Sequence, residues 1–281
     1  MSIVRSITSK IFKPAFLGLL AVNVLLPSGV FAQAKVQEAL TIFAAASLNE
    51  AFLAIGREFE AIHPGERVTF NFAGSQQLVQ QLANGAPADV FASADLKQMT
   101  EAAASGRIES NEISVFAHNR LVVVLPRDNK AGIHRLADLA HPHLKIILAD
   151  RAVPAGRYAL EFLMKCNHNA EFDTLFASNV LANVVSYEEN VRSVLSKIIL
   201  GEADAGVVYT SDVPLNNRKA VVTLDIPEKL NIFATYPIAV VKDAGSRSRA
   251  EEFVGYVLSG RGQSVLAQYG FISTTGIPAK K

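Results

Sequence analysis

The chain has 281 residues, of which 50% are hydrophobic and 19% are charged, and its formal net charge is +1. This apolar fraction excludes an intrinsically disordered chain, and 27 basic against 26 acidic residues argue against nucleic-acid binding through a basic surface. The single cysteine, Cys166, excludes an intrachain disulfide and a cysteine-rich zinc site. We expect Cys166 to be a buried structural thiol in a helix.

Residues 1–32 have the pattern of a secretory signal peptide. Three basic residues and no acid precede an apolar run at residues 15–26, and small residues follow it, so cleavage after Ala32 or after Ala34 fits. The apolar run is too short for a membrane span, which needs about 20 residues. We therefore predict that residues 1–32 are removed and that the protein is exported to the periplasm. The remaining chain would carry a formal charge of −2.

The rest of the sequence alternates short β-type runs with helical apolar spacing, which predicts an α/β protein with mostly parallel sheets flanked by helices. We expect helices between most of the strands, and two more at the C-terminal end, at residues 246–259 and 262–268. The expected strands cover residues 40–44, 68–72, 89–92, 121–125, 145–148, 180–185, 205–208, 221–224 and 233–241.

No linker or change of composition divides this part of the chain. We therefore expect two lobes that share strands, rather than two independent domains. Lobe I would comprise residues 33–118 and 236–281, and lobe II residues 119–235, with one strand crossing near each boundary. This division rests partly on the resemblance described below.

The sequence lacks the familiar catalytic motifs. It has no Gly-x-Ser-x-Gly elbow, no Gly-x-x-x-x-Gly-Lys loop and no His-Glu-x-x-His pair. The six histidines are scattered, and His141 and His143 flank a proline in an expected exposed turn, which is poor spacing for metal ligands. We expect neither catalysis nor a cofactor. A small exported hydrolase with Ser47 or Ser75 as nucleophile stays an alternative without positive support.

Four expected strands end in a small-residue turn that opens a helix. The free N–H groups and the positive dipole end of such helices can bind an anion without Lys or Arg. In open α/β sheets, ligands bind beyond the carboxyl ends of the strands, where these turns would lie. Ser47 and Ser75 could add hydroxyl donors there, or could simply cap their own helices. The turns contain Ala44–Leu48, Phe72–Gln76, Val153–Gly156 with Pro154 in the first helical turn, and Glu188–Arg192 with Asn190 as a candidate cap.

Four sequence blocks together resemble the periplasmic molybdate-binding proteins of bacterial ABC transporters, and the resemblance covers nearly all of the chain after residue 32. The C-terminal stretches Tyr236–Val241 and Gln268–Phe271 are also similar to that family. The blocks, in order, are Ala44–Leu48, Gly85–Asp95, Val153–Ala159 and Gly206–Asp212.

The resemblance implies a two-lobed type II periplasmic binding-protein fold with two hinge strands. It also implies that molybdate or tungstate binds between the lobes without any direct bond from the protein to the metal. The implied partners are an inner-membrane permease and its ATPase, and the protein would be a monomer. Another anion, such as sulfate or phosphonate, is the alternative ligand. The implied ligand contacts are the side chains of Ser47, Ser75 and Tyr209 and the backbone N–H groups of Ala155 and Val191.

The sequence departs from the family pattern at two places. Asn190 stands where the family often has Asp, and the stretch Gly74–Gln77 offers one hydroxyl where the family has a serine-rich stretch. Arg157 and Arg192 lie near the implied site. We expect both to be surface residues, because the family binds its dianion with neutral donors.

Overall fold

The computed structural model describes residues 39–213 and 219–274 of the chain. The predicted signal peptide lies outside these residues, which belong to one compact unit, Gln37–Lys281. Within the described ranges, no helix combines the length and the hydropathy needed to cross a bilayer.

The first lobe is built on three parallel strands, each followed by a helix. Strand β1 pairs with β2 on one side and with β3 on the other. Helix α1 packs against this sheet because its apolar residues Phe52, Ile55 and Phe59 recur every three or four positions and are all buried. The elements are β1 (Leu40–Ala45), α1 (Asn49–Ile62), β2 (Val68–Ala73), α2 (Ser75–Ala83), β3 (Val90–Ala92) and α3 (Leu96–Ala104).

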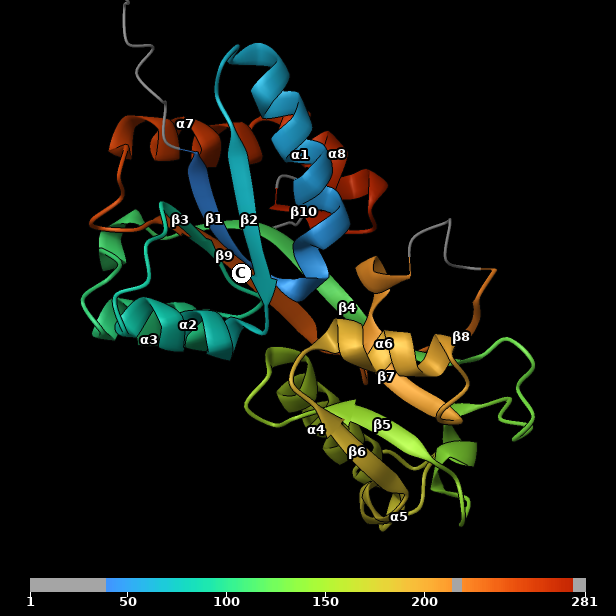
Figure 1. The fold of residues 1–281 in the computed structure, drawn as a ribbon. Helices are drawn as coiled ribbons and strands as arrows, with labels where there is room; N and C mark the ends of the chain where they lie inside the picture. Colours follow the sequence, from blue (N-terminus) through green and yellow to red (C-terminus); the bar gives the residue numbers. More distant parts are fainter. Residues whose placement is uncertain (1–38, 214–218, 275–281) are drawn as a thin grey trace, which may run out of the picture. The chain divides into compact units, whose positions relative to one another are not determined.

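The second lobe repeats this arrangement. Strand β5 pairs in parallel with β6 and with β7, and the helices lie between these strands in the sequence (Figure 1). Strands β5 and β7 are short and fully buried, as expected for parallel strands covered by helices, whereas β6, at the end of the strand order, is partly exposed. The elements are β5 (Ile146–Ala149), α4 (Pro154–Asn167), α5 (Phe176–Ala182), β6 (Val184–Glu188), α6 (Val191–Ile199) and β7 (Ala205–Tyr209).

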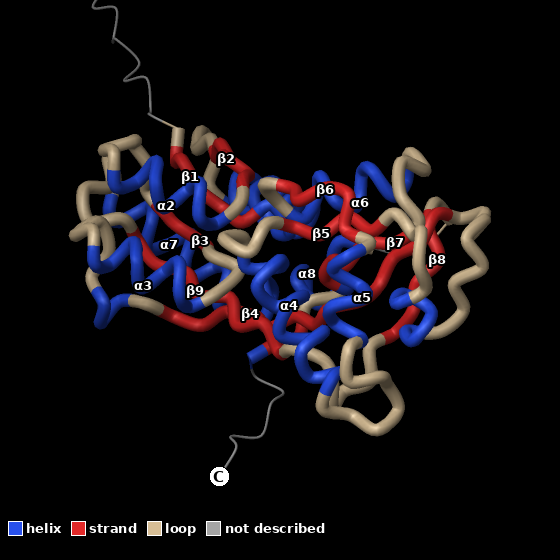
Figure 2. The backbone as a smooth tube through the Cα atoms, turned by 90° about the horizontal axis from the view of Figure 1, so that it is seen from below, coloured by secondary structure: helices blue, strands red, loops and turns tan. Residues whose placement is uncertain are grey.

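Two long strands, β4 (Ser114–Pro126) and β9 (Phe233–Val240), connect the lobes. The first half of β4 pairs with β9, and its second half pairs with β7 and with β8 (Val221–Asp225), always antiparallel. Strand β9 also pairs with β3, so the strand order is β2-β1-β3-β9-β4-β7-β5-β6 (Figure 1; Figure 2). Parallel pairs inside each lobe are thus joined by antiparallel hinge strands, which is the two-lobed α/β fold that was predicted.

The C-terminal elements return to the first lobe. Helix α8 (Gly260–Gln268) packs against α1, and α7 (Arg247–Leu258) packs against β9 and α1. Strand β10 (Ile272–Ser273) pairs with the first half of β4. The predicted lobe boundaries at residues 118/119 and 235/236 fall inside β4 and β9, and they stay a prediction. Short 3₁₀ turns complete the fold at Ala46–Leu48, Ser110–Glu112, Leu136–Ala140 and Thr210–Asp212.

One predicted strand was wrong. The run at residues 180–185 was expected to be extended, but helix α5 continues to Ala182 and β6 begins only at Val184. The buried residues Phe176, Ala177 and Val180 recur at helical spacing, so packing of the preceding turn extends the helix into the run. Most other predicted strands agree with the structure within two residues, while the run at residues 121–125 is the second half of the longer β4.

Cys166 is fully buried on α4, as predicted. Burial raises the pKa of its thiol to about 12, so the thiol stays protonated and unreactive at neutral pH.

Candidate functional site

The structure brings all five predicted ligand contacts to one cavity. Ser47, Ser75, Ala155, Val191 and Tyr209 line it together, although they lie on five different segments of the chain. Each follows or ends a strand of one of the two parallel groups, so the cavity lies at the carboxyl ends of β1, β2, β5, β6 and β7. The remaining lining residues are uncharged: Ala45, Ala46, Ala73, Gly74, Ala94, Val153, Pro154 and Asn190.

Helices begin at this cavity from both lobes. Pro154 is the first residue of α4, and Asn190 caps α6 by accepting a 3.0 Å hydrogen bond from the Ser193 N–H, both as predicted. Helix α2 begins at Ser75, directly after Gly74. The cavity therefore faces several N–H groups that have no partner within their own helix, together with the positive ends of the helix dipoles.

Neither serine caps its own helix. Ser47 lies in the 3₁₀ turn before α1, and its Oγ is 2.9 Å from the Tyr236 Oη. The Ser75 Oγ accepts a 3.1 Å hydrogen bond from the Ala94 N–H. Both hydroxyls are buried. Ser75 accepts in its contact and keeps its hydrogen, whereas in the contact between Ser47 and Tyr236 either hydroxyl could donate.

Tyr209 carries a buried hydroxyl with no protein partner. The side chain is 1% exposed, and its Oη finds no hydrogen bond within the described residues. Burial raises the pKa of this phenol well above its ordinary value, so it stays protonated. An unpaired buried hydroxyl is unusual in a native protein, and this one lies where the cavity would supply its partner.

Gly74 lies beside the cavity at a close approach of the two lobes. A Cβ at this position would be 2.6 Å from the backbone oxygen of Glu189 in the second lobe. The same carbonyl accepts a 2.8 Å hydrogen bond from the Gln76 Nε2, and the Glu189 carboxylate accepts one of 3.0 Å from the Gln77 Nε2. The absence of a side chain at Gly74 permits this approach.

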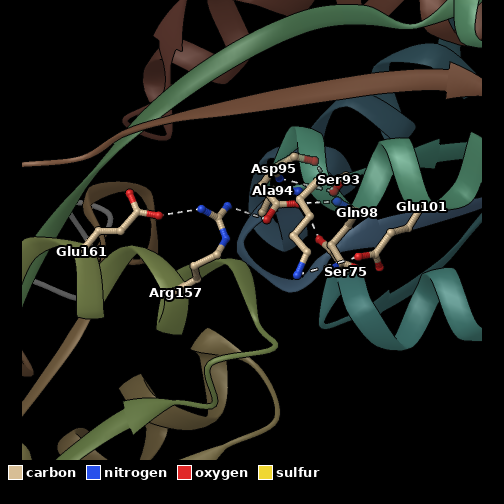
Figure 3. Close-up of polar contacts among 9 residues, drawn as sticks. Ser75, Ser93, Ala94, Asp95, Gln98, Glu101, Arg157 and Glu161 are labelled. Carbon is tan, nitrogen blue, oxygen red and sulfur yellow. Dashed lines mark hydrogen bonds and ion pairs between the residues drawn. The ribbon is translucent and has the colours of Figure 1, made fainter.

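The two arginines near the site are paired with carboxylates. Arg157 on α4 reaches Asp95 of the first lobe at 2.8 Å and Glu161 at 2.6 Å (Figure 3). Arg192 on α6 contacts Glu50 on α1, and its Nη1 is 3.9 Å from the Asp212 Oδ1. Neither arginine lines the cavity. Instead, both join the lobes beside it.

Two residues behind the cavity, Tyr236 and Asn119, belong to no functional motif in the sequence. Both are fully buried on the hinge strands, β9 and β4 respectively. Tyr236 contacts Ser47 across 189 positions of sequence. The Tyr236–Pro237 pair belongs to the stretch that resembles the family, which is the one signal that pointed to this position.

Metal ligation has no support in the described part of the chain. It holds no group of three or more His, Cys, Asp or Glu that could bind a metal ion. His141 and His143 are exposed.

The fold and the cavity define a class of protein. Two lobes joined by two strands, with strand ends and helix N-termini around one cavity, form the type II periplasmic binding-protein fold. Residues 40–272 match the family described as bacterial extracellular solute-binding protein, and the chain belongs to this family.

One relative and two solved structures show what this chain is similar to. The chain is 39% identical over 232 residues to the molybdate-binding protein ModA of Mycobacterium tuberculosis strain H37Rv, covering 83% of this chain and 84% of the relative. It is 32% identical to the substrate-binding domain of a putative molybdenum ABC transporter from Clostridium difficile, with a TM-score of 0.62 over 84% and 99% of the two chains. The sulfate-binding protein SubI of M. tuberculosis, 18% identical with a TM-score of 0.74 over 85% and 88%, shares the fold alone.

Proposed function

We propose that this protein is the periplasmic solute-binding component of an ABC importer and that it binds molybdate and tungstate. The observation that carries the proposal is the uncharged cavity that gathers Ser47, Ser75, Ala155, Val191 and Tyr209. The side chains of the two serines and the tyrosine, and the backbone N–H groups of Ala155 and Val191, would hold the oxyanion. The similarity to molybdate-binding relatives supports this ligand.

The cavity has the chemistry that a small dianion needs. Hydroxyl and backbone N–H groups donate to an anion with about 1.5–3 kcal/mol per bond in a site shielded from water. The N-terminus of α4 directs its dipole at this position, and so does that of α6. Five such donors can bind a dianion tightly without any cationic side chain.

Size is the feature that separates molybdate and tungstate from sulfate. All of these ions are tetrahedral, but the two metal oxyanions are larger. The donors lie on helix ends and buried strand ends, which move little. A ring of donors set for the larger ion would therefore contact sulfate poorly. The shared fold of the sulfate-binding neighbour makes sulfate the alternative ligand to test.

Binding without catalysis fits the serine environments. The partners of Ser47 and Ser75 in the described residues are the Tyr236 hydroxyl and the Ala94 N–H, not a histidine or a carboxylate. A serine needs an adjacent base to act as a nucleophile. We accordingly propose a carrier rather than a hydrolase.

Location and partners follow from the same proposal. The segment 1–32 would direct export, and the mature protein would act as a monomer that delivers its ion to a permease and ATPase in the inner membrane. N-terminal sequencing of the protein recovered from the periplasm tests this point. A start at residue 33 or 35 is expected, and an uncleaved N-terminus would contradict it.

The site is tested by replacing the unpaired hydroxyl, Tyr209→Phe. We expect molybdate affinity to fall about 10- to 100-fold, because one hydrogen bond to a charged group is lost. The thermal stability of the ligand-free protein should be unchanged or higher, since a buried unpaired hydroxyl is removed. Calorimetric titration and thermal unfolding measure the two quantities. Ser75→Ala should weaken binding by a similar factor.

The matched control is Tyr187→Phe, at a tyrosine that is 52% exposed and does not line the cavity. It should bind molybdate as tightly as the unmodified protein. Unchanged affinity in both Tyr209→Phe and Ser75→Ala would show that the ligand lies elsewhere.

A further inference from the structure

A buried chain of hydrogen-bonding groups runs behind Ser47. The Ser47 Oγ is 2.9 Å from the Tyr236 Oη, which is 3.4 Å from the Asn119 Nδ2. The same Nδ2 lies 2.7 Å from the Ser211 Oγ. All four residues are at most 3% exposed. The chain joins the cavity to both hinge strands and to the turn that follows β7.

The orientation of the Asn119 amide is fixed by its other contacts. Its Oδ1 accepts a 2.9 Å hydrogen bond from the Arg120 backbone N–H and another of 2.9 Å from the Thr210 Oγ1. A backbone N–H can only donate, so the amide oxygen must lie on that side. The Nδ2 group, which can only donate, therefore faces Tyr236 and Ser211.

This orientation decides the role of the Tyr236 hydroxyl. Facing an N–H donor, the Tyr236 Oη accepts on that side. Either hydroxyl could donate in its 2.9 Å contact with Ser47, and we assign the donor role to Tyr236, because Ser47 is the one acceptor that the described residues offer to its buried hydrogen. Burial raises the pKa of Tyr236 well above the ordinary value, so this hydrogen is retained at all ordinary pH values. The Ser47 Oγ then accepts from Tyr236, and the Ser47 hydrogen points away from it, towards the cavity that Ser47 lines.

Ser75 is held in the same way by a simpler contact. Its Oγ accepts from the Ala94 N–H, which leaves its hydrogen for the cavity. Both serines thus accept from the protein and offer a donor to a ligand. Of the five proposed contacts, only the Tyr209 hydroxyl could act towards a ligand either as donor or as acceptor, because the described residues give it no partner.

We propose that Asn119 and Tyr236 are positioning residues that fix Ser47 as a hydrogen-bond donor, so that the site favours fully deprotonated oxyanions over those that carry a proton. The inference rests on the proposed function. An O–H group on the ligand needs an acceptor, and a donor facing a donor leaves both unpaired in a buried place. Molybdate carries no proton at neutral pH, whereas inorganic phosphate keeps at least one. Discrimination would thus come from hydrogen-bond direction as well as from ion size.

The test measures the ratio of molybdate to inorganic phosphate affinity by calorimetry at pH 7 in the full-length exported protein. In Tyr236→Phe, Ser47 is free to rotate and to accept. We expect molybdate affinity to fall about tenfold while phosphate binding strengthens or stays constant, so that the ratio falls at least tenfold. A general loosening of the site would lower both affinities and leave the ratio in place. Tyr187→Phe is the control, and its ratio should be unchanged.

Two further variants show whether Tyr236 acts through Ser47. In a Ser47→Ala background, Tyr236→Phe should cause no further fall of the ratio, because the group that it orients is gone. Asn119→Asp, which keeps the shape and replaces the donor with an acceptor, should also lower the ratio. Asn119→Asp also tests the positioning role if Tyr236→Phe fails to fold.

The outcomes separate the two proposals. Failure of the unmodified protein to bind molybdate would overturn the proposed function. Molybdate binding with the same ratio in Tyr236→Phe and Asn119→Asp, or with additive effects of Tyr236→Phe and Ser47→Ala, would overturn the positioning role alone.

Discussion

At the level of single residues, the proposed site attracts an anion although the basic side chains beside it are already paired with carboxylates. Arg157 and Arg192 are the basic side chains beside it, and each is held by two carboxylates. Their charges are largely compensated before an anion binds. The field inside the cavity therefore comes from the helix ends and from oriented hydroxyl groups.

We expect Asp212 to make the stability of the protein depend on pH. It is fully buried, and burial raises its pKa to about 7, against the opposing charge of Arg192 and a hydrogen bond from the Tyr209 N–H. An unfolded Asp titrates near 3.9. Between about pH 4 and pH 7 the folded protein thus holds about one proton more than the unfolded chain. The contribution of Asp212 to the free energy of unfolding should be full at pH 4 and should be lost as the pH rises to 7.

Asp212→Asn removes this titration. Urea unfolding at several pH values gives the free energy of unfolding of both proteins. From pH 4 to 7 it should fall more steeply with pH for the unmodified protein than for the variant. The difference in slope should correspond to up to about one bound proton. Asp225→Asn, at an exposed position, should keep the steep profile. Identical slopes in the unmodified protein and in Asp212→Asn would contradict the assignment.

At the level of elements, the residues just before α2 and just after β6 set how closely the two lobes approach each other. Gly74 has φ −59° and ψ 138°, a conformation that alanine adopts without strain. The new methyl group of Gly74→Ala would instead come within 2.6 Å of the Glu189 carbonyl oxygen and within 2.5 Å of the flexible Gln76 side chain, which can move away more easily than the backbone. We expect the ligand-free stability to change little and molybdate affinity to fall about tenfold or more, since the donors of the two lobes could no longer reach one ion together.

The matched control is Gly255→Ala on α7, where an added methyl group would meet no heavy atom within 4 Å. It should leave affinity unchanged and raise thermal stability slightly, because alanine favours a helix. Equal affinities for the Gly74 and Gly255 variants, measured in the same titration, would show that close approach at Gly74 is not required.

The elements also show what the sequence can and cannot reveal. Strands β1, β2 and β5 and the turns that follow them were predictable because short apolar runs end in small residues, and the turn after β6 carried the capping signal Asn190. The run at residues 180–185 failed because apolar periodicity is ambiguous over so few residues. The place of Ser47 and Ser75 at one cavity follows from the α/β topology, so it could be anticipated.

The network behind the cavity could not be anticipated. The partnership of Ser47 with Tyr236, and that of Tyr236 with Asn119, join positions 189 and 117 residues apart. No local pattern marks such pairs. Arg157 and Arg192 were expected at the surface. Each is about one-third exposed or less and holds a carboxylate of the other lobe, a role that needs the folded lobes side by side.

At the level of the whole molecule, the contacts between the lobes are mostly modest ones. Partly exposed ion pairs such as Arg192–Glu50 contribute about 0–1 kcal/mol each, whereas each bond to a bound dianion contributes about 1.5–3 kcal/mol. A ligand held by five donors from both lobes would therefore dominate the free energy of holding the lobes together. Because the ligand would contribute more than the contacts between the lobes, a permease could distinguish the protein with bound ion from the empty protein.

The central claim is that the cavity selects large, fully deprotonated tetrahedral oxyanions. Its most direct test is calorimetric titration of the ligand-stripped exported protein with molybdate, tungstate, sulfate and phosphate under identical conditions. We predict one ion bound per chain, similar affinities for molybdate and tungstate, and at least about 100-fold weaker binding of sulfate and phosphate, a difference of about 2.7 kcal/mol. Sulfate binding as tight as molybdate binding, or no molybdate binding, would contradict the account.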